Sequence, residues 1–372
     1  MTSSTSPSEQ PVPSRVPRLA LALLTAAILA WVLGAVYTLR WNPEVAFFHR
    51  VHEAKQAWAA GLSPSNRVLL VGGSGCMTSI DPVRMREAHG LNVLNLGLGA
   101  GAGAKFLGRY AMDWARPGDL LILTVEPGIL TGAIDRKSLG VQLAAANGTW
   151  HLWDEPGSWE WPSRLLGLRP GGQHLFTLLG KAVLRQPWYR YGIDEIRPGG
   201  WHEVAARRQV PSPGPGPVAL SPEARAWLAD LKAQCDRKGV SVAYAIPWFY
   251  GSEADRPAMV EAHQRFLEDV GRIVPILPDP SMGVNTQRQD YADSLVHPTG
   301  EAARRRTDDL ARIRQAGLRL GLSTHGYAEM LRAAAVGPSQ FWELATTPEA
   351  LATYRISFGL ALLAALLNGI FG

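Results

Sequence analysis

An uncharged apolar stretch near the N-terminus constrains this chain more than any other feature. Residues 19–39 read LALALLTAAILAWVLGAVYTL. At a rise of about 1.5 Å per residue, a helix of this length can cross about 30 Å of hydrocarbon. We therefore predict that residues 19–39 form a transmembrane helix and that residues 1–18 form an N-terminal tail.

A cleaved signal peptide is the competing interpretation of this stretch. Signal peptides have a shorter apolar region, about 7–15 residues, followed by a small-residue cleavage site. No Ala-x-Ala-like site is evident after residue 39, so we expect an uncleaved anchor. Arg15 and Arg18 precede the stretch and favour a cytoplasmic N-terminus, although Arg40 follows it. We therefore expect the inner membrane, with the main domain on its periplasmic side.

A second uncharged run closes the chain. Residues 356–372 read ISFGLALLAALLNGIFG, which is at the lower limit of spanning length. A second membrane span, an interfacial helix and a docked terminal helix all remain open for it. The chain is thus expected to be single-pass or two-pass, with a helical C-terminal region over residues 321–372.

The composition points to a globular domain that needs no metal or cofactor. With 47% apolar residues in a chain of 372, a sizeable core can form. The formal charge is +5, but Lys and Arg form no basic block with interleaved aromatics, so we expect no nucleic-acid partner. Cys76 and Cys235 lie far apart and outside any metal-binding spacing, so neither a disulfide scaffold nor a zinc site is indicated.

Residues 60–320 alternate short apolar runs with helical stretches. This alternation is typical of a parallel sheet with helices on both faces, and runs rich in Val, Ile and Leu suit doubly buried strands. An insertion at about 127–218, rich in Trp, Gly and Pro, interrupts it and closes with PSPGPGP. Long irregular segments of this kind are usually lids or binding loops. The predicted strands are 67–71, 93–96, 120–125, 240–246 and 273–277, and the predicted helices are 82–89, 103–116, 221–238, 254–270 and 299–317.

A glycine-rich turn after the first predicted strand places a serine where it can react. The sequence VGGSGCMTSIDP puts Ser74 between Gly73 and Gly75 at a strand-to-helix turn. Such a turn can expose the hydroxyl and bring backbone amides near a reacting carbonyl. Turn chemistry alone also selects Gly and Ser, so this motif by itself is a weak signal for a nucleophile.

An acidic residue and a histidine share one loop near the other end of the domain. In YADSLVHPTG, Asp293 and His297 precede a predicted helix. A serine hydroxyl needs a neutral imidazole to take its proton, and a carboxylate holds that imidazole in the required tautomer. The alternative is ordinary helix-boundary chemistry, with Thr299 as an N-cap. Because Ser74 offers a partner, we predict a Ser74, His297 and Asp293 triad.

Three blocks of this sequence resemble the SGNH/GDSL hydrolase superfamily. The blocks are the Gly-Gly-Ser turn, NLGLGAGAG after the second strand and the late DSLVHPTG, and they span residues 65–315. More narrowly the chain looks like the membrane-anchored branch that resembles polysaccharide O-acetylation proteins. The resemblance implies a flavodoxin-like three-layer sandwich, an α/β fold with a parallel sheet. It also implies Ser74 as nucleophile, Asp293 and His297 as its partners, and oxyanion-hole amides from Ser74 and from Gly97, Gly99 or Ala100.

The sequence departs from the superfamily pattern at three places. Gly73 stands where Gly-Asp-Ser has its aspartate, and Thr124 and Glu126 of TVEP stand where an asparagine usually donates to the oxyanion. The spacing from Asp293 to His297 is one residue longer than the commonest form. These departures bear on the oxyanion hole more than on the nucleophile.

Several residues are predicted to contact substrate. Glu126 follows the third strand at the expected edge of the site, where it could act as an acid, a base or a substrate ligand, and Trp248 follows the fourth strand. Aromatic faces suit stacking on sugar rings or a membrane interface, although core packing is the simpler account of any one of them. Trp188 and Trp201 are the preferred ligands among the insertion aromatics, which are Trp150, Trp153, Trp159, Trp161, Trp188, Tyr189, Tyr191 and Trp201.

These observations predict a membrane-anchored serine esterase or O-acyltransferase that acts on an acylated carbohydrate or small ester. A multi-span membrane acyltransferase is the expected partner if the acceptor is a sugar. Two other functions remain open. One is an inactive scaffold or glycan-binding protein with the same fold. The other is an NAD-type oxidoreductase, since Gly97, Gly99 and Ala102 match a loose dinucleotide fingerprint.

Overall fold

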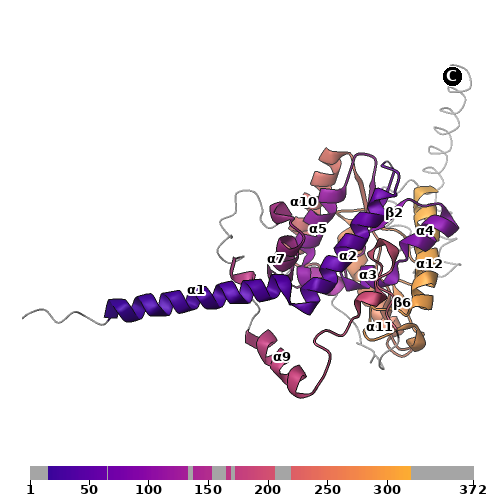
Figure 1. Ribbon diagram of the computed structural model, residues 1–372. Helices are drawn as coiled ribbons and strands as arrows, with labels where there is room; N and C mark the ends of the chain where they lie inside the picture. The colour runs from indigo at the N-terminus through magenta and orange to yellow at the C-terminus, as the bar shows by residue number, and fades with distance from the viewer. Residues whose placement is uncertain are drawn as a thin grey trace, which may run out of the picture.

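A four-stranded parallel sheet forms the centre of the molecule. The computed structural model describes residues 16–64, 66–132, 137–152, 165–168, 172–205 and 219–319. All neighbouring strands of the sheet run parallel, in the order β2-β1-β3-β4. The protein is therefore a mixed α/β structure, as predicted (Figure 1). The strands are β1 (Val68–Val71), β2 (Val93–Asn95), β3 (Leu120–Leu123) and β4 (Ser241–Tyr244), and a separate two-stranded sheet pairs β5 (Phe249–Tyr250) with β6 (Val284–Asn285).

Helices cover both faces of this sheet. The α-helices are α1 (Val16–Arg40), α2 (Pro43–Ala60), α3 (Ser74–Ser79), α4 (Pro82–His89), α5 (Ala104–Trp114), α6 (Pro127–Leu130), α7 (Lys137–Ala146), α9 (Gly172–Val183), α10 (Pro222–Lys238), α11 (Arg256–Gly271) and α12 (Gly300–Arg319). Short 3₁₀ turns occupy η1 (Ala100–Ala102), η2 (Trp150–Leu152), η3 (Ile193–Glu195), η4 (Pro198–Gly200) and η5 (Arg288–Asp290).

Successive strand residues enter two different hydrophobic clusters. On β1, Leu69 and Val71 pack with α2, α5, α10 and α11, whereas Val68 and Leu70 pack with α4 and α12. Side chains of a strand alternate between its two faces, so each strand supplies both clusters. Doubly buried strands of this kind require the continuous apolar runs seen in the sequence.

Local sequence signals explain where several helices begin and end. Asp81 caps α4 by accepting hydrogen bonds from the first-turn amides, and Ser221 caps α10 in the same way. A proline follows each cap at a position where a missing amide hydrogen costs nothing. Gly90 and Gly239 end these two helices in the left-handed conformation that glycine adopts without strain.

Two predictions about secondary structure need correction. Residues 273–277 are not a strand; Ile276 makes only an isolated parallel bridge with Tyr244. Pro275 has no amide hydrogen to donate to a ladder, and two more prolines follow within the next five residues, at 278 and 280. The described part of the insertion is also more helical than predicted, because α6, α7 and α9 lie within it.

Helix α2 is part of the core, although residues 40–59 were assigned to no domain from sequence. Phe47, Phe48 and Val51 are buried in the larger cluster. Lys55 is also buried, and its ammonium group donates to the carbonyl of Asn95 at 2.5 Å, at the end of β2. Burial lowers the pKa of Lys55 to about 7. The N-terminal helices are thus joined firmly to the sheet.

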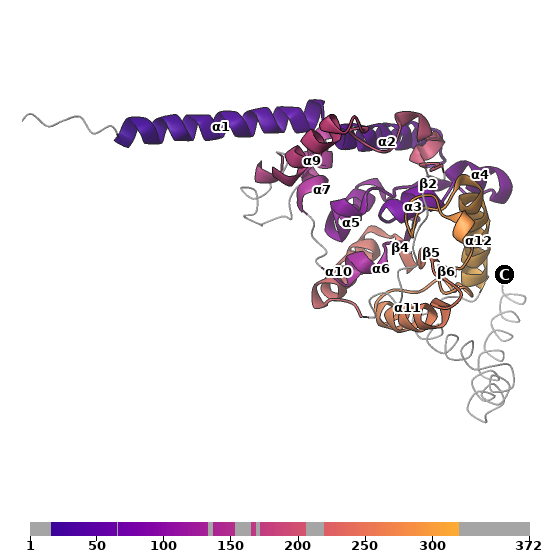
Figure 2. The same ribbon diagram turned by 90° about the horizontal axis from the view of Figure 1, so that it is seen from below.

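Helix α1 projects away from the rest of the molecule (Figure 2). Its segment Leu19–Arg40 is long and apolar enough to cross a membrane, and only 6% of its apolar window is buried. The predicted tail, apart from residues 16–18 at the start of α1, and the apolar run at 356–372 lie outside the described residues, as does the C-terminal region 321–372.

A buried ion pair between Arg67, directly before β1, and Asp119, directly before β3, gives a test of this fold. Asp119 accepts hydrogen bonds from the amide, Nε and Nη2 of Arg67, and both side chains are buried. Asp119→Ala leaves the Arg67 charge buried without its partner, so we expect a loss of about 3–5 kcal/mol in the free energy of unfolding. Chemical denaturation of the detergent-solubilised chain measures it. Asp236→Ala, which breaks an exposed pair with Lys232, should cost less than about 1 kcal/mol.

Candidate active site

Ser74 is the first residue of α3, immediately after the turn that leaves β1. Gly72, Gly73 and Gly75 have no positive φ, so a left-handed backbone is not the reason for glycine at these positions. The reason is close packing. A Cβ atom on Gly75 would lie 2.9 Å from Oε1 of Glu126 and 3.3 Å from Cβ of Val296. The turn therefore leaves Ser74 partly exposed while its two neighbours are pressed against other segments.

Glu126 holds this turn from the end of β3. Its carboxylate accepts hydrogen bonds from the amide of Gly73 at 3.0 Å and from the amide of Gly75 at 2.8 Å. The side chain is buried, and burial raises the pKa of the Glu126 carboxyl, although the amide hydrogen bonds and nearby His297 partly offset that rise. The structure places Glu126 against the serine turn, where its observed contacts are with the amides of Gly73 and Gly75.

Asp293 and His297 form a buried pair in one tight loop. Nδ1 of His297 lies 2.8 Å from Oδ1 of Asp293, and the amide of Ala292 donates to the carbonyl of His297, which closes the loop. Burial by itself raises the pKa of the Asp293 carboxyl, but hydrogen bonding to His297, the charge of Arg190 and the Tyr191 hydroxyl outweigh burial and lower it to about 2. Asp293 is thus ionised at neutral pH and accepts the Nδ1 proton of the imidazole.

The other nitrogen of this imidazole is available for chemistry. Nε2 of His297 is buried and has no hydrogen-bond partner among the residues that the structure describes, Ser74 included. With its proton on Nδ1, a neutral His297 presents Nε2 as a lone-pair acceptor. Hydrogen bonds of a catalytic serine and histidine often form only when substrate is bound.

The loop that carries His297 packs directly against the helix that begins at Ser74. The hydroxyl of Thr78 donates to the carbonyl of Ser74 at 2.9 Å and approaches the carbonyl of Val296 at 3.4 Å. Val296 also lies against Gly75, as described above. The structure thus brings the three predicted catalytic residues to the carboxyl edge of the sheet.

Two insertion residues contact the acidic partner, and sequence reasoning did not identify this role. Tyr191 donates to Oδ2 of Asp293 at 3.0 Å, and its oxygen lies 3.3 Å from Nδ1 of His297. Arg190 lies 3.6 Å from the same carboxylate oxygen and over the ring of Tyr191. No local pattern links residue 191 to residue 293, so only the path of the insertion through space could show this contact.

The predicted oxyanion-hole residues differ in what their amides do. The amide of Gly97 donates to the side chain of Asn95 at 2.9 Å, so it is already engaged. Asn95 is fully buried and donates to the carbonyls of Cys76 and Ile80, which fixes the turn after β2 against α3. Among the predicted donors this leaves Ser74, Gly99 and Ala100 for an oxyanion.

The predicted aromatic ligands occupy different environments. Trp201 is buried and donates to the carbonyl of Thr78, which fits support of α3 better than contact with substrate. Trp248 lies under the guanidinium of Arg306 and borders a shallow pocket beside β5 and β6. Trp188 is 53% exposed, and Trp150 is also exposed. The insertion residues Trp153, Trp159 and Trp161 lie outside the described residues.

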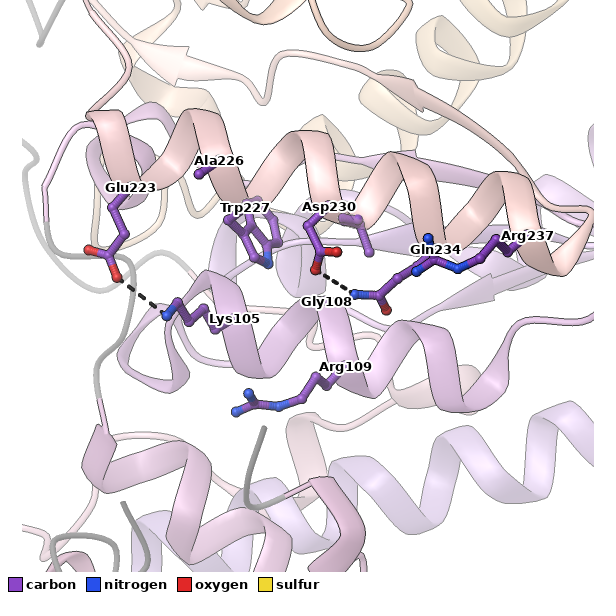
Figure 3. Close-up of a pocket in the computed structure, with 10 residues that line it drawn as sticks. Lys105, Gly108, Arg109, Glu223, Ala226, Trp227, Asp230, Gln234 and Arg237 are labelled. Atoms are coloured by element: carbon purple, nitrogen blue, oxygen red, sulfur yellow. Dashed lines mark hydrogen bonds and ion pairs between the residues drawn. The ribbon is translucent and has the colours of Figure 1, made fainter. Parts of the chain in front are cut away.

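A separate groove lies between α5 and α10 (Figure 3). Lys105 and Glu223 form an ion pair across it at 3.5 Å, and Trp227 lines its apolar part. None of the triad residues borders this groove. Within the described part of the chain there is no cluster of His, Cys, Asp and Glu that could hold a metal ion.

Comparisons with known proteins do not assign this chain to a family. No family model and no solved structure matches it. A stretch of 45 residues is 51% identical to the sulfate transport system permease protein CysT of Synechococcus elongatus. That match covers 12% of this chain and 16% of the permease, so the chain spans about one sixth of the length of the protein it matches.

The crowding around Ser74 predicts different effects for two glycine substitutions. Gly75→Ala forces its new methyl group against Glu126 and Val296, so we expect a loss of about 1–3 kcal/mol in the free energy of unfolding. Gly128→Ala in α6 meets open space and should be neutral or stabilising by up to about 1 kcal/mol. Denaturation of both variants measures the difference, and equal stabilities would contradict the packing described here.

Proposed function

We propose that this protein is a membrane-anchored serine esterase or O-acyltransferase of the SGNH type, with a flavodoxin-like three-layer domain. One observation carries the proposal: His297 is held by the ionised Asp293 through Nδ1, and it keeps a buried, unpartnered Nε2 on a loop packed against the helix that begins at Ser74. An imidazole oriented by a carboxylate, on a loop packed against the helix that begins with a serine at a glycine-rich turn, is the arrangement that supports acyl transfer.

In the proposed reaction, His297 acts first as a general base. Nε2 takes the proton of the Ser74 hydroxyl as Oγ attacks the carbonyl carbon of an ester. The tetrahedral intermediate then collapses: the bond to the leaving alcohol breaks, and His297 returns the proton to that alcohol. Asp293 stabilises the imidazolium between these steps. Amides of Ser74 and of Gly99 or Ala100 are the candidate donors to the oxyanion.

The second half of the reaction releases the acyl group from Ser74. Water or a sugar hydroxyl gives its proton to His297 and attacks the acyl-enzyme, and Ser74 leaves as the restored hydroxyl. With water the protein is an esterase, and with an acylated carbohydrate as product it is an O-acetyltransferase served by a membrane acyl donor. Partial exposure of Ser74 leaves room for either acceptor.

The anchor gives this activity its location. We propose that α1 crosses the inner membrane with its N-terminus in the cytoplasm, which places the domain in the periplasm. The long, exposed apolar surface of α1 supports a span, and Arg15 and Arg18 before it support the orientation.

A second function, an inactive glycan-binding scaffold, is favoured by one observation. The Glu126 carboxylate binds the amides of Gly73 and Gly75 on both sides of Ser74. An anionic group so close to the nucleophile opposes the negative charge that develops during acyl transfer. Chemical labelling of Ser74 distinguishes the two functions.

The nucleophile is tested with a fluorophosphonate probe and with p-nitrophenyl acetate. We expect the solubilised full chain to be labelled at Ser74 and to hydrolyse the ester, because the probe and the ester both require an activated serine. Ser74→Ala should lose both reactions, whereas Ser241→Ala, at an exposed position on β4, should keep them. Absence of labelling in folded protein would favour the scaffold.

Tyr191→Phe tests the positioning of the base. Loss of the hydroxyl removes a hydrogen bond to the Asp293 carboxylate, so we expect kcat to fall about tenfold, equivalent to about 1.4 kcal/mol, with little change in KM. Because the pKa of Asp293 is about 2, the carboxylate stays charged and the deficit should be constant across neutral pH. Tyr189→Phe is the control, since that ring packs beside Tyr191. An unchanged kcat in Tyr191→Phe would remove Tyr191 from the site.

A further inference from the structure

Helix α9 presents an apolar face that the rest of the described chain leaves uncovered. Phe176, Leu179 and Val183 are 77%, 63% and 81% exposed, and their spacing places them on one side of the helix. Leu184 and Trp188, which follow the helix, are also exposed, at 67% and 53%. Contiguous apolar patches of this kind on a protein surface mark an interaction site.

The segment just before α9 is attached to the membrane helix. The indole nitrogen of Trp31 in α1 donates to the carbonyl of Leu165 at 3.0 Å. Ala35 of α1 packs with Val141 of α7 and with Leu168 in a small separate cluster. Figures 1 and 2 both show α9 near the end of α1 that joins the body. These contacts hold the segment before α9 against the second half of the predicted span, near the end at which α1 joins the body.

Side chains near this end of α1 match the chemistry of a membrane interface. Trp41, at the end of α1, is 68% exposed, and tryptophan is enriched where hydrocarbon meets headgroups. Lys181 lies on the other side of α9 from Phe176, Leu179 and Val183, and Arg185 follows the helix; interfacial helices carry cations on their polar face in this way. Lipid phosphates attract such cations, while the apolar side chains can enter the outer part of the acyl region.

We propose that the face formed by Phe176, Leu179, Val183, Leu184 and Trp188 docks on the bilayer that α1 crosses. The occupant is an anionic lipid surface, and α9 is an interfacial helix that enters the headgroup and acyl boundary by about 5–10 Å. This inference rests on the proposed span of α1. It also bears on the site, because only Tyr189 and Arg190 separate Trp188 from Tyr191, which contacts Asp293.

The docked arrangement has a consequence for the substrate. The carbonyl of Trp188 accepts a hydrogen bond from Lys181 at 2.9 Å, so the end of the docking surface is tied back to α9. The chain that leaves this surface reaches the triad within three residues. The site is thus held near the lipid surface, where a membrane-attached acyl donor or acceptor is presented.

Fluorescence quenching in vesicles tests the docking. The full chain carries an environment-sensitive fluorophore on Val183→Cys, and it is reconstituted into vesicles of phosphatidylcholine and phosphatidylglycerol. Labelling is directed to the new thiol because Cys76 and Cys235 are buried. Matched labels are attached to Leu24→Cys in α1 and to Glu268→Cys in α11. Figures 1 and 2 show α11 away from α1.

We expect lipids with a nitroxide near the headgroup to quench the label at 183 several-fold more than the label at 268. Lipids with a nitroxide deep in the acyl chain should quench the label at 24. Leu179→Asp should reduce quenching at 183 and leave quenching at 24 unchanged, whereas Ala226→Asp on α10 should alter neither.

The outcomes separate the docking from the span. If the label at 24 is quenched and the label at 183 behaves like that at 268, docking is overturned and the span stands. If neither 24 nor 183 is quenched, both are overturned. Quenching at 183 that persists in Leu179→Asp also overturns docking through this face.

Discussion

The close approach of three backbone segments at the carboxyl edge of the sheet is the constraint on which the site depends. The amide of Leu98 donates to the carbonyl of Gly72, which joins the turn after β2 to the turn after β1. A Cβ atom on Gly72 would collide with Thr124 after β3, and one on Gly97 would collide with the backbone of α3. Packing this tight leaves the residues of the serine turn little freedom, so Ser74 is placed by backbone contacts before any side chain acts.

The surroundings of two buried carboxyl groups next to this turn shift their pKa values in opposite directions. Asp293 receives hydrogen bonds from His297 and Tyr191 and the charge of Arg190, and its pKa falls to about 2. Glu126 is also buried but receives hydrogen bonds from the neutral amides of Gly73 and Gly75, and burial raises its pKa. Pairs of carboxyl groups with opposed shifts are typical of sites in which one stays charged and the other can carry a proton.

The sequence was informative where the signal is local. Asp293 and His297 share a loop of a few residues, so their pairing could be predicted, and four of the five predicted strands are continuous apolar runs that the structure confirms. The fifth failed because its run contains Pro275, which cannot complete a ladder.

Contacts that depend on the path of a long segment could not be predicted from the sequence. Tyr191 contacts Asp293 across 102 residues of sequence, and its aromatic character alone suggested stacking on sugar or lipid. Helix α2 was missed for a different reason. It is buried by the body of the protein and by η4, and it contains Lys55 among its buried residues, so it lacks the clear division into apolar and polar faces that reveals a surface helix.

The junction between α1 and α2 sets how the domain can move. Only Trp41 and Asn42 separate the two helices, and Asn42 is buried and caps α2 through the amide of Glu44. Since α2 is itself embedded in the core, α1 continues into the folded body through this two-residue junction. In the proposed membrane arrangement, so short a junction sets the height of Ser74 above the bilayer, and a substrate has to be presented at that height.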